Sequence, residues 1–241
     1  MGTPRGALRR LTALVEALAV EKRYRDRVVL RSITLSLAAG EVLGVAGPNG
    51  SGKSTLGRIL LGFSCPSAGR VTIGGIEPSA FRETFGVGFV HEDGARGWER
   101  ATLRDLLALR LSEPARYEDD EVCQVLRITA LLDQPVASLS KGQWRICQTA
   151  YALVARPRFV LLDEPDAGLD PAAQERLRTA IAIVAAAGAG VIVFSHHLDE
   201  LALGVQRLIL LSRGMVQAEF DPRGLAAAAL RRRYLAAAEG C

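Results

Sequence analysis

A glycine-rich run in the first quarter of the chain has the residue types and spacing that bind phosphate. Its nine consecutive residues are Gly47, Pro48, Asn49, Gly50, Ser51, Gly52, Lys53, Ser54 and Thr55. The run fits G-x-x-x-x-G-K-[ST], in which glycines let the backbone curl around an anion and point its N–H groups at phosphates. We expect the Lys53 ammonium to reach the β- and γ-phosphates and the Ser54 hydroxyl to bind Mg²⁺. A purely structural turn is the alternative, but the flanking sequence favours a nucleoside triphosphate site.

Two adjacent acids could supply the rest of this chemistry. Asp163 and Glu164 follow the apolar run 159–162, which reads as a buried strand. Open parallel sheets bind ligands at the carboxyl ends of their strands, where these acids lie. Asp163 would hold Mg²⁺ through water, and Glu164 would orient and polarise an attacking water. Acidic pairs are common on surface turns, yet a phosphate loop in the same chain favours the catalytic interpretation.

The elements that must position these residues follow from short apolar runs. Residues 42–46 predict a buried strand before the phosphate loop, and a helix is expected to begin near Lys53, with its positive dipole end towards the anion. Further strands are expected within 14–37 and over 71–73, 85–90, 159–162, 191–194 and 208–211. Helical patterns separate the last three runs, and this alternation predicts a parallel sheet covered on both faces.

The middle of the chain has a different pattern. Thr102 begins a capping-box-like sequence ahead of an apolar helical face, and a second helix is expected over 117–132. We therefore predict one α/β domain over residues 14–220 with a small helical subdomain inserted at about 96–150. A short helical tail is expected over 221–241, where Arg231–Arg233 would form a solvated face or contact anionic lipid or a partner.

Composition restricts the class of protein. The 241 residues are 49% hydrophobic and 23% charged, as in ordinary soluble globular proteins. The longest apolar stretch, 180–194, is too short for a membrane helix and contains Gly188 and Gly190. No signal peptide is recognised, so a cytoplasmic location is expected. A net charge of +4 does not require a nucleic-acid partner, and none is expected. The scattered cysteines predict reduced, structurally incidental thiols.

A further segment, Leu139-Ser140-Lys141-Gly142-Gln143, precedes the acidic strand. Ser140 is a good N-cap, and the N–H groups that follow could form an anion site or simply an ordinary helix start. Here the chain resembles the ATP-binding cassette family, whose signature L-S-G-G-Q contacts ATP held by the other subunit. The resemblance extends from about Leu14 to Met215. It implies a P-loop NTPase core with a parallel sheet, an N-terminal antiparallel β subdomain and a small helical subdomain.

The resemblance also implies roles for individual residues. Tyr24 would stack on adenine, and the loop 167–170 would cross a dimer interface. His196 would contact the γ-phosphate, whereas Ser140, Gly142 and Gln143 would contact ATP in the partner. Two such cassettes would sandwich two ATP molecules head to tail and separate after hydrolysis. The implied partners are a second cassette subunit, identical or different, and separate integral membrane permease subunits.

Three positions depart from the family pattern. Glu92, preceded by His91, matches the position where the family usually has a glutamine that senses the γ-phosphate, unless the register is one residue off. Its carboxylate could bind Mg²⁺ and tune or slow the site through its charge, or it could be a solvated surface acid. Lys141 replaces the first glycine of the signature, and its charge could face the partner's ATP or solvent, with solvent favoured. Tyr151 replaces a usual arginine. None of these changes removes Lys53, Asp163, Glu164 or His196, so ATP hydrolysis is expected.

The resulting hypothesis is the ATP-hydrolysing subunit of a membrane transporter, held at the inner face of the membrane by its permease. Export is favoured weakly, because the helical insertion is short and L-S-K-G resembles signatures of export systems. Import remains a close second. The alternative from another class is a soluble cassette ATPase that acts as a regulator or assembly factor without a transported cargo.

Overall fold

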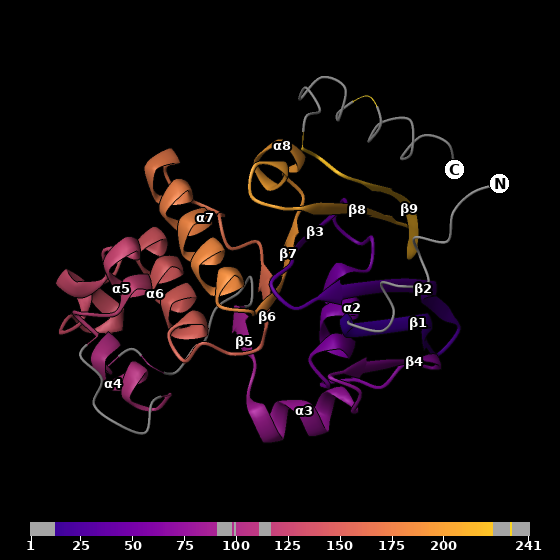
Figure 1. Ribbon diagram of the computed structural model, residues 1–241, viewed down its shortest axis with the longest axis horizontal. Helices are drawn as coiled ribbons and strands as arrows, with labels where there is room; N and C mark the ends of the chain where they lie inside the picture. The colour runs from indigo at the N-terminus through magenta and orange to yellow at the C-terminus, as the bar shows by residue number, and fades with distance from the viewer. Residues whose placement is uncertain (1–12, 91–97, 99, 111–116, 224–231, 233–241) are drawn as a thin grey trace.

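The computed structural model of the chain describes residues 13–90, 98, 100–110, 117–223 and 232. Two sheets form its framework (Figure 1). The first is antiparallel, with strand order β2-β1-β4, and contains β1 (Ala13–Tyr24), β2 (Arg27–Ala38) and β4 (Ala68–Ile73). The second has the order β5-β6-β7-β3-β8-β9, and only β9 runs antiparallel to its neighbour. Its strands are β3 (Val42–Ala46), β5 (Gly88–Val90), β6 (Phe159–Asp163), β7 (Gly190–Ser195), β8 (Arg207–Ser212) and β9 (Met215–Phe220).

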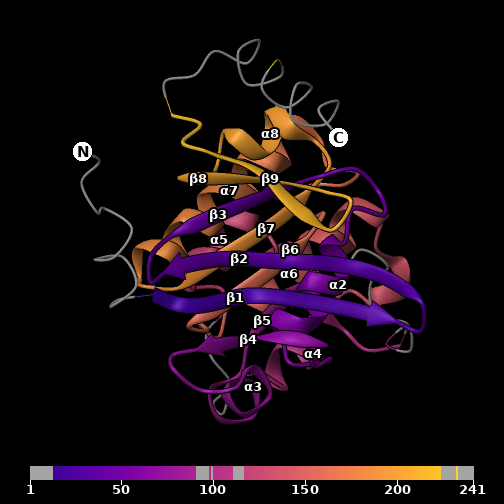
Figure 2. The same cartoon turned by 90° about the vertical axis from the view of Figure 1, so that its right-hand side faces the viewer.

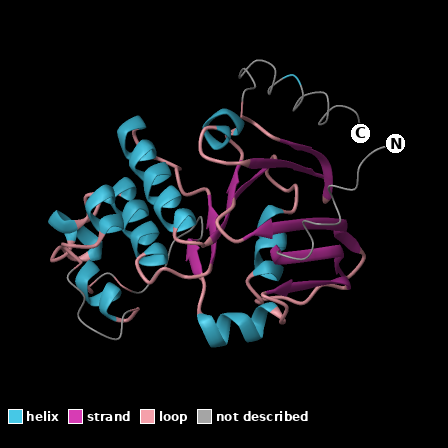
Figure 3. Ribbon diagram, in the orientation of Figure 1, coloured by secondary structure: helices cyan, strands magenta, loops and turns pink. Residues whose placement is uncertain are grey.

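Helices cover one face of the six-stranded sheet, and the antiparallel sheet with α2 covers the other (Figures 1 and 3). The helices are α2 (Lys53–Leu60), α3 (Pro78–Phe85), α4 (Leu103–Ala108), α5 (Glu121–Leu126), α6 (Lys141–Leu153), α7 (Pro171–Ala186) and α8 (Leu198–Ala202), with short 3₁₀ turns at Thr129–Leu131 and Val136–Ser138. The predicted α/β class with a separate antiparallel sheet is confirmed. The view in Figure 2 places β1 and β2 in front of the central strands.

The central strands are apolar along their middle residues because both of their faces are buried, and polar residues stand only at their ends. Along β6, Phe159 and Leu161 pack with α2 and the antiparallel sheet, whereas Val160 and Leu162 pack with the helices α5 to α8. Side chains alternate between the two faces of a strand, so the middle residues of a strand between two cores are apolar on both faces. The continuous apolar runs in the sequence therefore predicted these strands correctly.

Two predicted elements differ from the structure. Phe85 is not in a strand: it ends α3, a helix that begins at Pro78 and buries Phe81. Gly86 has φ 68°, and the strand β5 begins only at Gly88. The expected helix over 117–132 is likewise shorter, because Asp120 caps α5 and Arg127 ends it in the left-handed region at φ 55°. The spacing of apolar residues alone did not reveal where the backbone leaves the helix or strand conformation.

The apolar stretch 180–194 divides as the sequence predicted. It contains the end of α7, a turn that includes Gly188, and β7. Within the described ranges, no helix combines the length and the apolar character needed to span a bilayer. Of the predicted tail, only 221–223 and residue 232 are described, so the helical tail stays a prediction.

Two of the cysteines lie in the core beneath the helices. Burial raises the pKa of the Cys147 thiol to about 12, and burial with the nearby Asp120 carboxylate raises that of Cys123 to about 12. Both thiols therefore stay protonated near neutral pH and act as small apolar side chains. Cys65 is a free thiol on the surface, and Cys241 lies outside the described residues.

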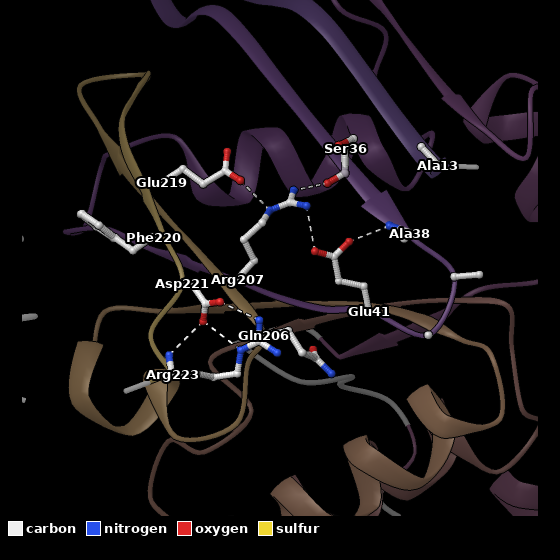
Figure 4. A pocket seen from close by; sticks show the side chains of 12 residues that line it. Ala13, Ser36, Ala38, Glu41, Gln206, Arg207, Glu219, Phe220, Asp221 and Arg223 are labelled. Carbon is white, nitrogen blue, oxygen red and sulfur yellow. Dashed lines mark hydrogen bonds and ion pairs between the residues drawn. The ribbon is translucent and has the colours of Figure 1, made fainter. Parts of the chain in front are cut away.

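A buried arginine joins the two sheets at the amino-terminal edge of the central strands (Figure 4). The Arg207 guanidinium lies 2.8 Å from Oε1 of Glu41 and 2.8 Å from Oε1 of Glu219, and it donates to the carbonyl oxygen of Ser36. Glu41 in turn accepts the N–H of Ala38 at 2.8 Å. These contacts tie β2, β3, β8 and β9 together beside a pocket of about 580 Å³.

Candidate functional site

The glycine-rich run forms the loop between β3 and α2 and the first residues of α2, at the carboxyl end of a strand that lies between β7 and β8. Gly47 has no room for a side chain, since a Cβ there would lie 2.2 Å from the carbonyl oxygen of Leu211. Gly52 precedes α2 with φ 111°, a conformation that favours glycine. The glycines are therefore required by close packing and by backbone conformation, and the loop opens at the start of a helix as an anion site requires.

Lys53 extends along the inside of this loop. Its residue is only 7% exposed, and Nζ donates to the carbonyl oxygen of Gly47 at 2.5 Å and to that of Pro48 at 3.5 Å. The loop lines a pocket of about 270 Å³ together with residues of β2 and of the carboxyl end of β6. The full lining is Arg27, Val29, Pro48, Asn49, Gly50, Ser51, Gly52, Lys53, Ser54, Thr55, Asp163 and Glu164. The two predicted halves of the nucleotide site thus meet in one pocket.

Asp163 ends β6, which is separated from the phosphate-loop strand only by β7. Its Oδ2 accepts a hydrogen bond from the Ser54 hydroxyl at 3.5 Å. A hydroxyl and a carboxylate oxygen beside a phosphate-binding loop form the hard oxygen set that Mg²⁺ prefers. These two residues therefore fit the metal that the sequence predicted for them.

Glu164 is held by its burial, its backbone conformation and several contacts. It is 4% exposed and has φ 50°, a left-handed conformation that costs a non-glycine residue on the order of 1–3 kcal/mol. Its N–H donates to the carbonyl oxygen of Phe194 at 2.9 Å. The carboxylate Oε1 lies 2.8 Å from Nδ1 of His196 and 4.0 Å from Nζ of Lys53. Lys53 and His196, each predicted separately from the sequence, thus both lie beside the buried Glu164 carboxylate.

The signature segment lies elsewhere, at the start of α6. Ser140 caps this helix: its hydroxyl accepts the Gln143 N–H at 3.2 Å, and the Gln143 side chain accepts the Ser140 N–H at 2.9 Å. A Cβ on Gly142 would lie 3.3 Å from the carbonyl oxygen of Gly168, so this glycine allows the loop 167–170 to pass close by. Ser140, Gly142 and Gln143 line a second pocket of about 590 Å³ that shares no residue with the phosphate pocket.

Three cationic side chains also line this second pocket. They are Arg127 at the end of α5, Lys141 in the signature and Arg176 on α7. Among the described residues, none of the three charged groups has a hydrogen-bond or ion-pair partner. Lys141 is solvent-exposed, as favoured from the sequence, and it also faces the pocket. Arg127 and Arg176 were missed because they lie far from the signature in sequence.

The predicted adenine-stacking residue, Tyr24, is paired with a residue that lines the phosphate pocket. Tyr24 ends β1, is 45% exposed and pairs with Arg27 across the β1–β2 hairpin, but it is not among the lining residues. Lys22 places its ammonium 5.1 Å from the tyrosine ring centroid. Arg27 and Val29 do line the pocket, as alternate residues of one strand face. Sequence reasoning missed Arg27, although strand alternation after Tyr24 could have revealed it.

The other departures from the family pattern have different outcomes. Glu92 and His91 lie outside the described residues, so the proposed Mg²⁺ contact of Glu92 stays a prediction. Tyr151 has a guanidinium beside it from another element: Arg110 lies 5.2 Å from its ring centroid and donates to the carbonyl oxygen of Val87 at 2.7 Å. This contact links the helical region to the segment that leads into β5.

Comparison with known families agrees with this geometry. A model of the ABC transporter family matches residues 30–167, a span that includes the phosphate loop, the signature segment and both acids. The chain belongs to the ABC transporter family. The chain is an ATP-binding subunit, and the ATPases of this family hydrolyse ATP.

Several curated relatives of this ABC subunit are known. The lipopolysaccharide export system ATP-binding protein LptB of Acidithiobacillus ferridurans is 33% identical, over 88% of this chain and 92% of that protein. The taurine import ATP-binding protein TauB of Pseudomonas aeruginosa is 36% identical, over 84% of this chain and 78% of that protein. The Nod factor export ATP-binding protein I of Mesorhizobium japonicum is 32% identical over 89% of this chain, which spans 65% of that relative's length.

Solved structures share the fold. An ATP-binding subunit of an ABC transporter superposes with a TM-score of 0.81 at 26% identity, covering 92% of this chain and 99% of that one. A dimeric bacterial ABC transporter cassette gives a TM-score of 0.74 at 24% identity, and the match covers 88% of this chain and 100% of that one. Both similarities extend over nearly the whole ABC subunit.

Proposed function

We propose that this ABC subunit hydrolyses ATP at Glu164 and thereby drives a membrane transporter through closure and opening of a cassette dimer. The observation that carries the proposal is the Glu164 carboxylate, which is buried at the phosphate pocket, 2.8 Å from His196 and 4.0 Å from Lys53. A buried carboxylate beside a phosphate loop can accept the proton of an attacking water. The water oxygen bonds to the γ-phosphorus, the bond to the β-phosphate oxygen breaks, and ADP and phosphate leave.

The other pocket residues have supporting roles in this proposal. The loop backbone and Lys53 hold the triphosphate, and His196 is close enough to Glu164 to contact the γ-phosphate. Ser54 and Asp163 would hold Mg²⁺, which offsets the negative charge of the phosphates when bound. Tyr24, which pairs with the pocket-lining Arg27 across the β1–β2 hairpin, would stack on the adenine ring.

The separation of the two pockets supports a dimer. Ser140, Gly142 and Gln143 share no pocket with the phosphate loop, so they would contact ATP held by a second cassette. The same two surfaces on the partner would complete a second site. The partner is an identical or related cassette, and permease subunits would hold the pair at the inner face of the membrane.

The names of the relatives favour a transport system over a regulator without cargo. All three reported relatives are named for export or import systems. We propose export, supported by the lipopolysaccharide and Nod factor export proteins, with the taurine import protein as the case for import. Transport of a substrate into or out of membrane vesicles that contain the copurified permease would decide the direction.

The hydrolysis step is tested by Glu164→Gln, which keeps the shape of the side chain and removes its basic oxygen. We expect kcat to fall by roughly 10²–10⁴-fold with ATP binding retained, and an ATP-bound dimer to accumulate. Steady-state ATPase assays and size-exclusion chromatography measure both effects. Glu175→Gln, on the exposed surface of α7, is the matched control and should behave as wild type. Full turnover by Glu164→Gln would refute this assignment.

A further inference from the structure

Ser195, the last residue of β7, joins the phosphate loop to the catalytic carboxylate. Its side chain is buried, with the residue only 1% exposed. Its carbonyl oxygen accepts the N–H of Gly47, the first residue of the loop, at 3.3 Å. Its hydroxyl accepts the N–H of His197 at 3.0 Å and donates to Oε2 of Glu164 at 3.3 Å.

The direction of these hydrogen bonds is fixed by chemistry. The backbone N–H of His197 can only donate, so the serine oxygen receives it with a lone pair. An ionised carboxylate can only accept, so the one hydroxyl proton is directed at Glu164. Because His196 lies 2.8 Å from Oε1, each carboxylate oxygen of Glu164 has its own neighbour. Rotation of the carboxylate would break both contacts.

We propose that Ser195 is a positioning residue that holds the Glu164 carboxylate in the orientation needed for hydrolysis. The proposal rests on the role of Glu164 proposed above. Ser195 acts through Glu164 and does not itself contact the reacting atoms. A hydroxyl is needed here because an unpaired oxygen on a buried carboxylate costs free energy and would draw the side chain to another partner.

A merely structural role is the competing interpretation. Ser195 also supports the turn before α8 through His197, and loss of that contact alone would lower stability without affecting the carboxylate. The two roles differ in their kinetic consequences. Misorientation of the carboxylate lowers kcat, whereas a structural defect lowers the folded fraction and leaves the properties of folded enzyme unchanged.

The first test replaces Ser195 with alanine and with threonine. For Ser195→Ala we expect kcat to fall by roughly tenfold or more, as for loss of a hydrogen bond to a charged group, with the KM for ATP unchanged. Ser195→Thr keeps the hydroxyl and should restore most of kcat. Ser212→Ala removes another buried serine, at the end of β8, and should keep wild-type kcat. Wild-type kcat in Ser195→Ala, or an equal loss in Ser195→Thr, would overturn the proposal.

The second test is a double-mutant cycle with Glu164→Gln. If Ser195 acts only through the carboxylate, Ser195→Ala should add no further loss in the Glu164→Gln background. A further full tenfold loss there would overturn the proposal. If Ser195→Ala does not fold, Ser195→Cys supplies the same cycle with a weaker donor of similar shape. Full activity of Glu164→Gln alone would refute the proposed function, whereas an inactive Glu164→Gln with a fully active Ser195→Ala would refute only this inference.

Discussion

The phosphate pocket and the signature pocket are both suited to phosphate, but their charges are satisfied in different ways. In the phosphate pocket, Lys53 donates to the loop carbonyls, and Glu164 lies against His196 and Ser195. In the signature pocket, the charged groups of Arg127, Lys141 and Arg176 make no hydrogen bond or ion pair with the other described residues. The charged groups of the phosphate pocket are thus bonded to other residues of the same chain, whereas those of the signature pocket face solvent.

This difference indicates which part of the reaction each surface performs. A site whose side chains are already held in place can bind and hydrolyse ATP with little reorganisation. A pocket with unpaired cations and a capped helix start gains its counter-charge only when an anion arrives from outside. In the proposed mechanism these surfaces are two complementary half-sites, which a second cassette would bring together.

The largest expected effects separate ATP binding from hydrolysis at the two half-sites. Lys53→Ala should weaken ATP binding by the isolated subunit by at least roughly 10²-fold, because it removes the buried charge inside the phosphate loop. Ser140→Arg should leave that binding unchanged, since Ser140 lies in the other pocket, yet it should abolish hydrolysis by blocking the signature surface. Titration with a fluorescent ATP analogue at low protein concentration, followed by ATPase assays, measures both.

Loss of ATP binding by monomeric Ser140→Arg would break the distinction between the half-sites. A circular dichroism spectrum and a melting curve for each variant would show that neither result comes from unfolding.

The next effect concerns stability at the opposite edge of the sheet. Arg207→Met leaves the Glu41 carboxylate, on a side chain only 12% exposed, without its arginine partner, which should lower the free energy of unfolding by about 3 kcal/mol. Urea denaturation measures the loss. Affinity of the folded protein for ATP should not change, because the network is remote from both half-sites. Arg223→Ala, which removes an exposed ion pair with Asp221, is the control and should leave the unfolding midpoint unchanged.

The smallest expected effect belongs to the cations of the signature pocket. Replacing Arg127, Lys141 and Arg176 together with glutamine should lower hydrolysis several-fold at low ionic strength and much less in high salt, because salt screens exposed charges. ATPase rates over a range of KCl concentrations test this. A control in which Arg31, Arg70 and Arg223 become glutamine removes equal charge outside the pocket. Equal losses in both triple variants would indicate a general charge effect and not a specific surface.

Much of the phosphate pocket could be predicted from sequence because its geometry depends on local rules. The glycine spacing before Lys53 defines the loop, and the apolar run before Asp163 and Glu164 defines a strand that ends at the same edge. The Ser140 cap was predictable for the same reason, since a capping box involves residues three positions apart.

Other features depend on contacts between distant segments. The Ser195 hydroxyl, at the end of β7, donates to Glu164, which follows the neighbouring strand β6. Arg127 lines the signature pocket at the point where α5 ends in a left-handed residue, earlier than the sequence predicted. The sequence predicted Phe85 in a strand because an apolar residue before Gly86 can belong to a helix or to a strand. The structure shows that a helix, α3, begins at Pro78 and includes Phe85. Tertiary packing decided these cases, and local pattern could not.

The most direct test of the two half-sites mixes variants that are each blocked at one of them. A dimer of Lys53→Ala with Ser140→Arg subunits retains one intact site, formed by the Ser140→Arg phosphate loop and the Lys53→Ala signature, although neither homodimer has any. Differently tagged subunits are coexpressed, the heterodimer is purified through both tags, and its ATPase activity is measured. If the two half-sites complete each other across the dimer, the heterodimer should hydrolyse ATP measurably and neither homodimer should. A confirmed heterodimer without ATPase activity would contradict the proposal of two complementary half-sites.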